Sequence, residues 1–112
     1  MLNNVIIVGR LTKDVEVIES ENGTKRSYIT LAVNRSFKNA DGEVETDFIN
    51  VILWNNLAEN VCEYCKKGDV IGIKGRIEVN RYVKDDETKY VTEVVAERLT
   101  FLSSKKSLEE EK

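Results

Sequence analysis

The segment 47–54, DFINVILW, constrains the fold most, because its composition and alternation are those of a β-strand. Side chains on a strand alternate between two faces, so Phe48 and Trp54 share one face. The opposite face is uniformly aliphatic: Ile49, Val51 and Leu53. At about 3.3 Å per residue the two rings lie roughly 20 Å apart, too far to pack on each other. We therefore expect the aliphatic face to supply core and the aromatic face to suit an extended ligand with flat groups.

The composition indicates one soluble globular domain. The chain has 112 residues, of which 41% are hydrophobic and 33% are charged. No apolar run reaches the length of about 18 residues that suggests a membrane span. The N-terminus has neither a basic region nor a small-residue cleavage site, so we expect a cytoplasmic location without a signal peptide. With two cysteines and no export signal, a disulfide framework is not expected.

Charge is distributed unevenly along the chain. The formal net charge of -3 argues against a nucleic-acid partner, since proteins that bind nucleic acids are usually basic. However, residues 25–38 contain four basic residues and no acidic one, and residues 66–84 contain six basic residues against two acidic ones. Acidic residues collect where turns are expected, as in 41–47 and 85–87. Attraction to a polyanion is therefore expected to be local, moderate and salt-sensitive.

The periodicity predicts five β-strands and one helix. The strands are expected at residues 5–18 (long or broken), 26–35, 46–54, 70–83 and 89–102. Asn22-Gly23 and Asp41-Gly42 indicate hairpin turns. A helix follows the third strand, because Asn56 and Glu59 have the spacing of a capping box, apolar residues recur at helical spacing, and Gly68 marks the end.

This order of elements predicts an all-β fold, the five-stranded OB-fold Greek-key barrel with one short helix between strands 3 and 4. Barrels of this kind use one strand face and its loops to bind oligonucleotides or oligosaccharides. The absence of proline fits long, uninterrupted strands. The expected organisation is an OB-fold domain over residues 1–102 and a short polar C-terminal tail over residues 103–112.

Three motifs are better explained by structure than by chemistry. Cys62 and Cys65 form a C-x-x-C near a helix C-terminus, where the dipole disfavours a thiolate, and no His or third Cys completes a zinc site, so we expect core cysteines. Gly72-x-x-Gly75 lies within a strand pattern, which favours a bulge or close packing over a phosphate loop. The acidic run 85–87 lacks the spaced ligands of a calcium loop, so we expect a solvated loop and no metal.

With no histidine and no activated nucleophile, neither catalysis nor a cofactor is expected.

The aromatic residues give the strongest functional signal. A single aromatic residue on a strand is more often part of a core. Four of them, however, lie on three predicted strands near basic residues: Phe37, Phe48, Trp54 and Tyr82. Aromatic rings stack on bases while cations follow the phosphates of a single strand, which requires the two residue types to be interleaved as they are here. The remaining aromatics are assigned to the core or the helix surface: Tyr28, Tyr64, Tyr90 and Phe101.

Residues 1–102 resemble the bacterial single-stranded DNA-binding (SSB) protein family, in the blocks NNVIIVGRLTKD, ITLAVNRSF, TDFINVILWNNLAENVCEYCKKGD, IGIKGRI and YVTEVVAERLTFL. The resemblance implies an OB-fold subunit that assembles as a homotetramer and binds single-stranded DNA without strong sequence preference. The family's stacking aromatics fall onto the four residues named above. Its basic backbone contacts transfer to Arg35, Lys38, Lys67, Lys74, Arg76 and Arg81. Glu78 and Asn80 occupy strand positions that are often more basic in relatives.

The C-terminus departs from the longer members of that family. Those members carry a Gly-, Pro- or Gln-rich linker and an acidic tip with a terminal hydrophobic residue, which recruits replication and repair proteins, whereas this sequence ends in EEEK. We expect a short paralogue, a phage or plasmid form, or a shortened chain, and partner recruitment is not carried over. The expected function is non-catalytic binding and protection of single-stranded DNA in replication, recombination, repair or DNA uptake, with no membrane partner. The alternative is an OB-fold primosomal or assembly subunit whose aromatic face contacts protein.

Overall fold

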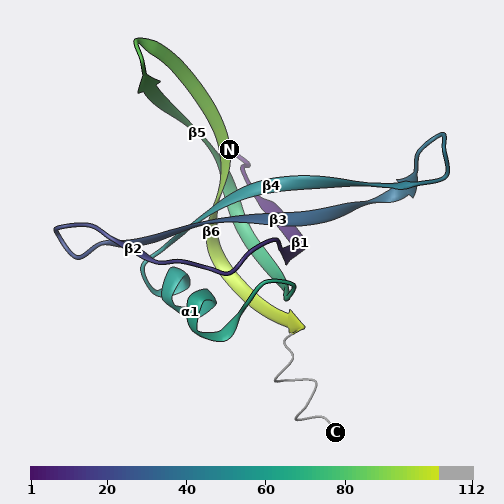
Figure 1. Cartoon of the computed structure of the whole chain (residues 1–112), viewed down its shortest axis with the longest axis horizontal. Coiled ribbons are helices and arrows are strands. Elements are labelled where there is room, and N and C mark those ends of the chain that lie inside the picture. Colours follow the sequence, from purple (N-terminus) through teal and green to yellow (C-terminus); the bar gives the residue numbers. More distant parts are fainter. Residues whose placement is uncertain (104–112) are drawn as a thin grey trace, which may run out of the picture.

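The computed structural model describes residues 1–103, which form one helix and six strands (Figure 1). The elements are β1 (Val5–Leu11), β2 (Ile18–Glu19), β3 (Lys25–Lys38), β4 (Val44–Trp54), α1 (Asn56–Tyr64), β5 (Val70–Lys84) and β6 (Glu87–Ser103). The first strand was predicted to be either long or broken. It is broken, because β2 is a separate two-residue strand beside β3. The five long strands and the helix after β4 confirm the predicted OB-fold. Apart from Ser103, the predicted tail lies outside the described residues.

The five long strands close into a barrel. β5 pairs with β1 and β6, and β4 pairs with β3 and β6. β1 then pairs with β3 through Arg10↔Ala32 and Leu11↔Leu31, which completes the circuit. The β4–β6 pairing is the one parallel contact in the described sheet and is equally short, Val51↔Val94 and Ile52↔Val95. The barrel therefore closes through two short junctions between longer ladders.

Alternating side chains from the long strands fill the barrel. Burying large aliphatic side chains is the main favourable term in folding, and each is worth about 1.5–3 kcal/mol when fully buried. The largest side chains with almost no exposed surface are Leu11, Leu31, Leu53, Ile71, Ile73, Val51 and Val61. α1 covers this core with Ala58 and Val61. The predicted aliphatic face of β4 is thus confirmed as core.

Gly75 allows a close approach of backbones. A Cβ atom at this position would overlap the carbonyl oxygen of Val95, and the β5–β6 register shifts between Lys74 and Gly75. The prediction that Gly72-x-x-Gly75 reflects a bulge or close packing is confirmed at Gly75. At Gly72 a Cβ would meet Leu102 only at ordinary contact distance, 3.4 Å. The motif is therefore structural, with one of its two glycines indispensable.

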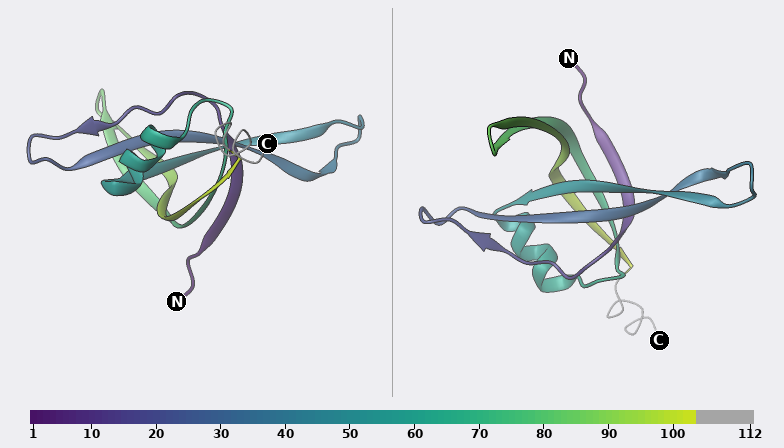
Figure 2. Two further views of the ribbon diagram at one scale, coloured as in Figure 1. Left: turned by 90° about the horizontal axis from the view of Figure 1, so that it is seen from below. Right: turned by 45° about the horizontal axis from the view of Figure 1, so that its top comes forward.

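Two hairpin arms extend beyond the barrel (Figure 2). We call residues 34–46 the β3–β4 arm and residues 78–92 the β5–β6 arm; almost all of their side chains are exposed. The radius of gyration is 15.8 Å, whereas a compact chain of this length would have about 13 Å. At the tip of the β5–β6 arm, Asp85 and Asp86 both have positive φ between the paired residues Lys84 and Glu87. Positive φ at two central residues is typical of a two-residue hairpin turn. The acidic run therefore lies in an exposed turn, as expected.

The start of α1 differs from the prediction. The N-cap is Asn55 rather than Asn56, and no side chain makes a cap hydrogen bond. Asn55 instead accepts a hydrogen bond from the backbone amide of Lys25 through Oδ1 (3.2 Å), while Glu59 pairs with the ammonium of Lys25. Asn56 is thus the first residue of the helix and not its cap, and the carboxylate of Glu59 pairs with a distant strand instead of closing a capping box. Residues 1–103 contain no helix with the length and apolar character needed to cross a membrane.

The C-x-x-C splits between core and surface. Cys65 is buried and Cys62 is exposed, with Sγ 3.4 Å from the carbonyl oxygen of Val15. The prediction of two core cysteines is therefore wrong for Cys62. The buried stripe of α1 runs through Ala58 and Val61 to Cys65, and Cys62 is rotated away from it. Burial raises the pKa of the Cys65 thiol to about 11, so this thiol is protonated at neutral pH.

Candidate nucleic-acid interface

The outer face of the β3–β4 sheet carries two exposed rings from β4. Phe48 is 67% exposed and lies opposite Ala32, and Trp54 is 39% exposed and lies opposite Arg26. Between them Thr30 and Asn50 are hydrogen-bonded across the strands, Oγ1 to Oδ1 at 3.2 Å. Both rings therefore lie on the solvent side of β4, on the face that the alternation predicted. The lower exposure of Trp54 shows that part of its surface is covered.

Tyr82 stands on the β5–β6 arm, 44% exposed. Its hydroxyl donates a hydrogen bond to Oε1 of Glu93 (3.0 Å), and Nδ2 of Asn80 donates to the same oxygen (2.9 Å). Glu93 is only 5% exposed, so this carboxylate lies under the surface that Tyr82 covers. The hydrogen bond to Glu93, followed by desolvation, raises the pKa of Tyr82 above its usual value. The phenol therefore stays protonated at neutral pH and its ring is held at one end.

Two of the predicted phosphate-binding cations are already paired with carboxylates. Arg35 makes a two-pronged contact with Asp47 (Nε–Oδ2 3.1 Å, Nη2–Oδ1 3.0 Å) and a further one with Glu45 at 2.6 Å. On the barrel, Arg76 contacts Glu78 at 2.6 Å. A phosphate must compete with these carboxylates for the same donors. Both guanidinium groups are therefore less available than their place in the sequence indicates.

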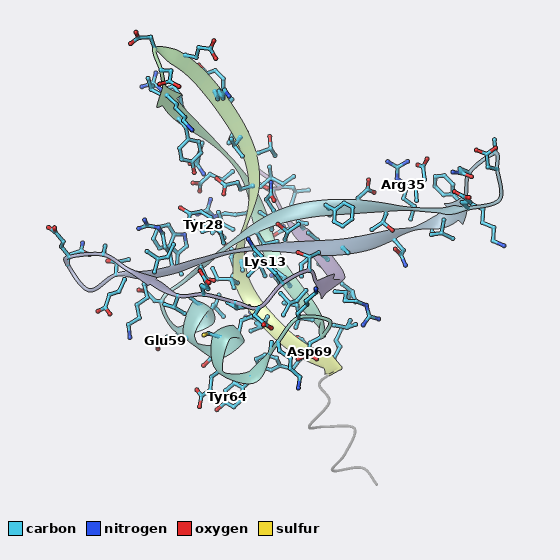
Figure 3. The ribbon with its side chains drawn as sticks, viewed as in Figure 1. Lys13, Tyr28, Arg35, Glu59, Tyr64 and Asp69 are labelled. Atoms are coloured by element: carbon cyan, nitrogen blue, oxygen red, sulfur yellow. The ribbon has the colours of Figure 1, made fainter. Side chains whose placement is uncertain are left out.

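Strand register also separates several cations from the rings. Arg35 follows the alternation of Val33 and Asp47, so it lies on the face opposite Phe48 (Figure 3). Arg81 pairs with Tyr90, on the face of the β5–β6 arm opposite Tyr82. On the β5–β6 arm, the cations that share a face with Tyr82 are Lys84 and Lys89, and Lys89 is the cross-strand neighbour of Tyr82.

The remaining predicted residues are spread over the molecule. Phe37 and Lys38 are exposed at the outer end of β3, in the β3–β4 arm. Lys74 is exposed on the outer face of β5 between Ile6 of β1 and Arg98 of β6. Lys67 lies in the turn between α1 and β5. Figure 1 shows this turn at the end of the barrel away from the β5–β6 arm. The structure thus leaves all four predicted rings exposed, on β3, β4 and β5, but does not gather all the cations beside them.

Comparison with known proteins identifies the family. The model of the "Single-strand binding protein family" matches residues 2–102. Single-stranded DNA-binding protein B of Bacillus subtilis is 46% identical over 94% of this chain and 94% of that protein. Single-stranded DNA-binding protein 3 of Listeria innocua is 47% identical over 96% of this chain and 68% of that protein. The chain belongs to the single-strand binding protein family.

Members of this family bind DNA without catalysing a reaction, which confirms the expectation that the chain is not an enzyme. Within residues 1–103 no three His, Cys, Asp or Glu side chains are grouped so that they could hold a metal ion. The chemistry of the surface therefore lies in its rings, amides and charges.

Sequence reasoning missed two residues of this family member's outer face. Tyr28, assigned to the core or the helix surface, is 44% exposed and alternates with the buried Ser27 and Ile29, which places it on the outer face of β3. Tyr90, which received the same assignment, is exposed on the β5–β6 arm. Tyr64 does lie on the helix surface, edge-to-face with the partly exposed Phe101 at 5.8 Å. The alternation of β3 carried the signal for Tyr28, because Ile29, Leu31 and Val33 already defined the core parity.

Proposed function

We propose that this protein binds and protects single-stranded DNA without reading its sequence. The observation that carries the proposal is the set of exposed rings, with Phe37 on the β3–β4 arm, Tyr82 on the β5–β6 arm, and Phe48 and Trp54 on β4. The family and the relatives named for single-stranded DNA binding support it. Each ring offers a flat apolar surface that every base can stack on, worth about 1–3 kcal/mol per base.

Cations on the same arms would neutralise phosphates. Lys84 and Lys89 flank Tyr82, and Lys38 lies beside Phe37. Lys67, Lys74 and Arg81 would reach parts of a strand that continues around the barrel, while Arg35 and Arg76 would first have to leave their carboxylates. Because each phosphate that a cation neutralises releases counterions, we expect binding to weaken steeply with salt.

A homotetramer is part of the proposal. Residues 5–9 of β1 pair with β5 on one edge, and pairing with β3 begins only at Arg10, so the other edge of this stretch has no strand partner among the described residues. Ile6 and Val8 on this strand are exposed. An exposed apolar strand with a free edge favours pairing with a second copy. Replication, recombination, repair and DNA uptake are the processes in which such an assembly would act.

The decisive test is a titration followed by the emission of Trp54, the one tryptophan of the sequence. Oligo-dT should quench the emission, and the affinity should fall with salt and exceed that for a duplex of equal length. Unchanged emission together with equal affinity for duplex would contradict the proposal. If Phe48→Ala with Trp54→Ala disrupts a protein complex and leaves DNA affinity intact, the assembly-subunit alternative is favoured instead.

Light scattering on a size-exclusion column tests the assembly. The expected mass is that of four chains at micromolar concentration, and the mass of one chain would contradict the tetramer.

A further inference from the structure

Arg26 and Tyr28 form a cation–aromatic pair on the outer face of β3. The guanidinium carbon of Arg26 lies 6.0 Å from the centre of the Tyr28 ring. Arg26 is also directly opposite Trp54 in the β3–β4 register, so residues with two rings and one cation are neighbours on the same face of the sheet. This is the combination of flat surface and positive charge that single strands bind.

The charge of Arg26 is available to a ligand. Unlike Arg35 and Arg76, Arg26 takes part in no ion pair within residues 1–103. Its Nε is buried without a hydrogen-bond partner in the described residues, so this donor is also left for a ligand to satisfy.

Tyr28 borders a hollow of about 280 Å³, large enough for a flat ring. Lys13, Asp14, Glu16 and Ile18 line the rest of this hollow. Figure 3 shows Lys13 and Tyr28 near the crossing of the β3–β4 sheet and the β5–β6 arm. Two carboxylates in the lining disfavour a phosphate inside it. A base would therefore occupy the hollow, while its phosphate stays on the open side near Arg26.

Tyr28 lies beside the route between Trp54 and Tyr82. Its cross-strand neighbour is Ile52 of β4, which in turn pairs with Val95 of β6. Glu93, two residues before Val95, accepts the hydrogen bond from Tyr82. A strand of DNA that runs from Trp54 to Tyr82 would therefore pass over Ile52, next to Tyr28.

We infer that Tyr28 and Arg26 form a further nucleotide subsite, in which one base of the single strand stacks on Tyr28 and its phosphate contacts Arg26. The inference rests on the proposed function and adds a position to it. The subsite lies beside the route from Trp54 to Tyr82, at the cross-strand neighbour of Ile52.

A single-tryptophan reporter tests the subsite directly. The variant Tyr28→Trp with Trp54→Phe places the one tryptophan at position 28, and its emission should be quenched when oligo-dT binds. The matched control, Tyr64→Trp with Trp54→Phe, puts the reporter on α1, on another side of the molecule from Tyr28 (Figure 3), and its emission should not change. Binding of both variants is monitored independently by the anisotropy of labelled oligo-dT.

Two substitutions then measure the contribution of each residue. Tyr28→Ala is expected to weaken oligo-dT binding at least about fivefold, because one stacked base is lost. Arg26→Gln should lower the salt dependence of binding, and Tyr64→Ala should leave both quantities unchanged. Thermal melts of all variants confirm folding.

The outcomes separate this inference from the function itself. If the wild-type protein binds oligo-dT but the position-28 reporter is not quenched and Tyr28→Ala binds like Tyr64→Ala, the subsite is wrong and the function stands. If the wild-type protein does not bind oligo-dT, the proposed function fails first.

Discussion

The hydroxyl of Tyr82 is hydrogen-bonded to Glu93, a carboxylate that is almost completely buried and that also binds the amide of Asn80. The bond fixes the outer end of the ring, since Glu93 is held on β6 and Tyr82 is held on β5. A ring fixed before DNA arrives loses less conformational entropy when a base stacks on it.

Removal of this bond should therefore cost less than removal of the ring. Tyr82→Ala is expected to weaken oligo-dT binding by about 1–3 kcal/mol, the value of one stacked base. Tyr82→Phe keeps the ring and loses the hydrogen bond, so its effect should be clearly smaller. Fluorescence titrations at one salt concentration measure both. Equal losses for the two variants would show that the hydroxyl, and not stacking, makes the contact.

The two sides of the β5–β6 arm should differ in their contribution to salt dependence. Lys84→Gln removes a cation from the face of Tyr82, and the slope of log K against log salt should fall by about 0.7, as for one phosphate contact to a single strand. Arg81→Gln removes a cation from the opposite face and should change the slope less. Titrations over a salt series provide the slopes. A larger effect for Arg81 would show that the strand runs over the other side of the arm.

Acid should weaken the base of the β3–β4 arm through Asp47, which pairs with Val33 directly below it. The hydrogen bonds from Arg35 hold the pKa of Asp47 below its usual value of 3.8. A carboxyl whose pKa is lower in the folded state stabilises the fold above the unfolded pKa, and this contribution is lost as the pH falls through the folded value. Asp47→Asn should therefore be less stable than the wild type at pH 7 and should lose less stability below pH 3.8.

Urea unfolding at neutral and acidic pH measures this difference. Asp41→Asn, in the loop of the same arm, is the matched control and should follow the wild type. An acid-induced loss in Asp47→Asn as large as in the wild type would exclude Asp47 as the source.

The two cysteines should react differently with an alkylating agent. Cys62 is exposed, whereas Cys65 is buried and the pKa of its thiol is raised to about 11. Since the thiolate is the reactive form, we expect one modified cysteine per native chain near pH 8 and two in denaturant. Mass spectrometry of the intact protein counts the adducts, and peptide mapping identifies the residue. Modification of Cys65 at the rate of Cys62 in the native protein would contradict the burial of its thiol.

Features set by local alternation could be predicted from the sequence. The aliphatic parity of Ile49, Val51 and Leu53 predicted the core face of β4, and the same rule applied to Arg81 and Tyr82 separates them onto opposite faces. Element order was sufficient to predict the OB-fold, because each strand and the helix carries its own periodicity.

Features set by contacts distant in sequence could not be predicted. The ion pairs of Arg35 depend on the register of β3 against β4, which shifts between Asn34 and Lys38. The N-cap at Asn55 depends on its bond to Lys25, thirty residues away. Neither partner can be recognised from the spacing of neighbouring residues, so the availability of a cation to phosphate is a property of the fold.

The junction between β4 and β6 is short, so a ligand bound across it should stabilise the closed barrel. Two residue pairs in parallel register join β4 to β6, whereas β5 and β6 are paired along nearly their whole length. A strand of DNA that contacts both Trp54 and Tyr82 would cross this junction and hold its two sides together. Since a ligand that binds only the folded state stabilises it, bound DNA should raise the melting temperature. Protection of backbone amides from exchange should increase at the four residues of this junction, Val51, Ile52, Val94 and Val95.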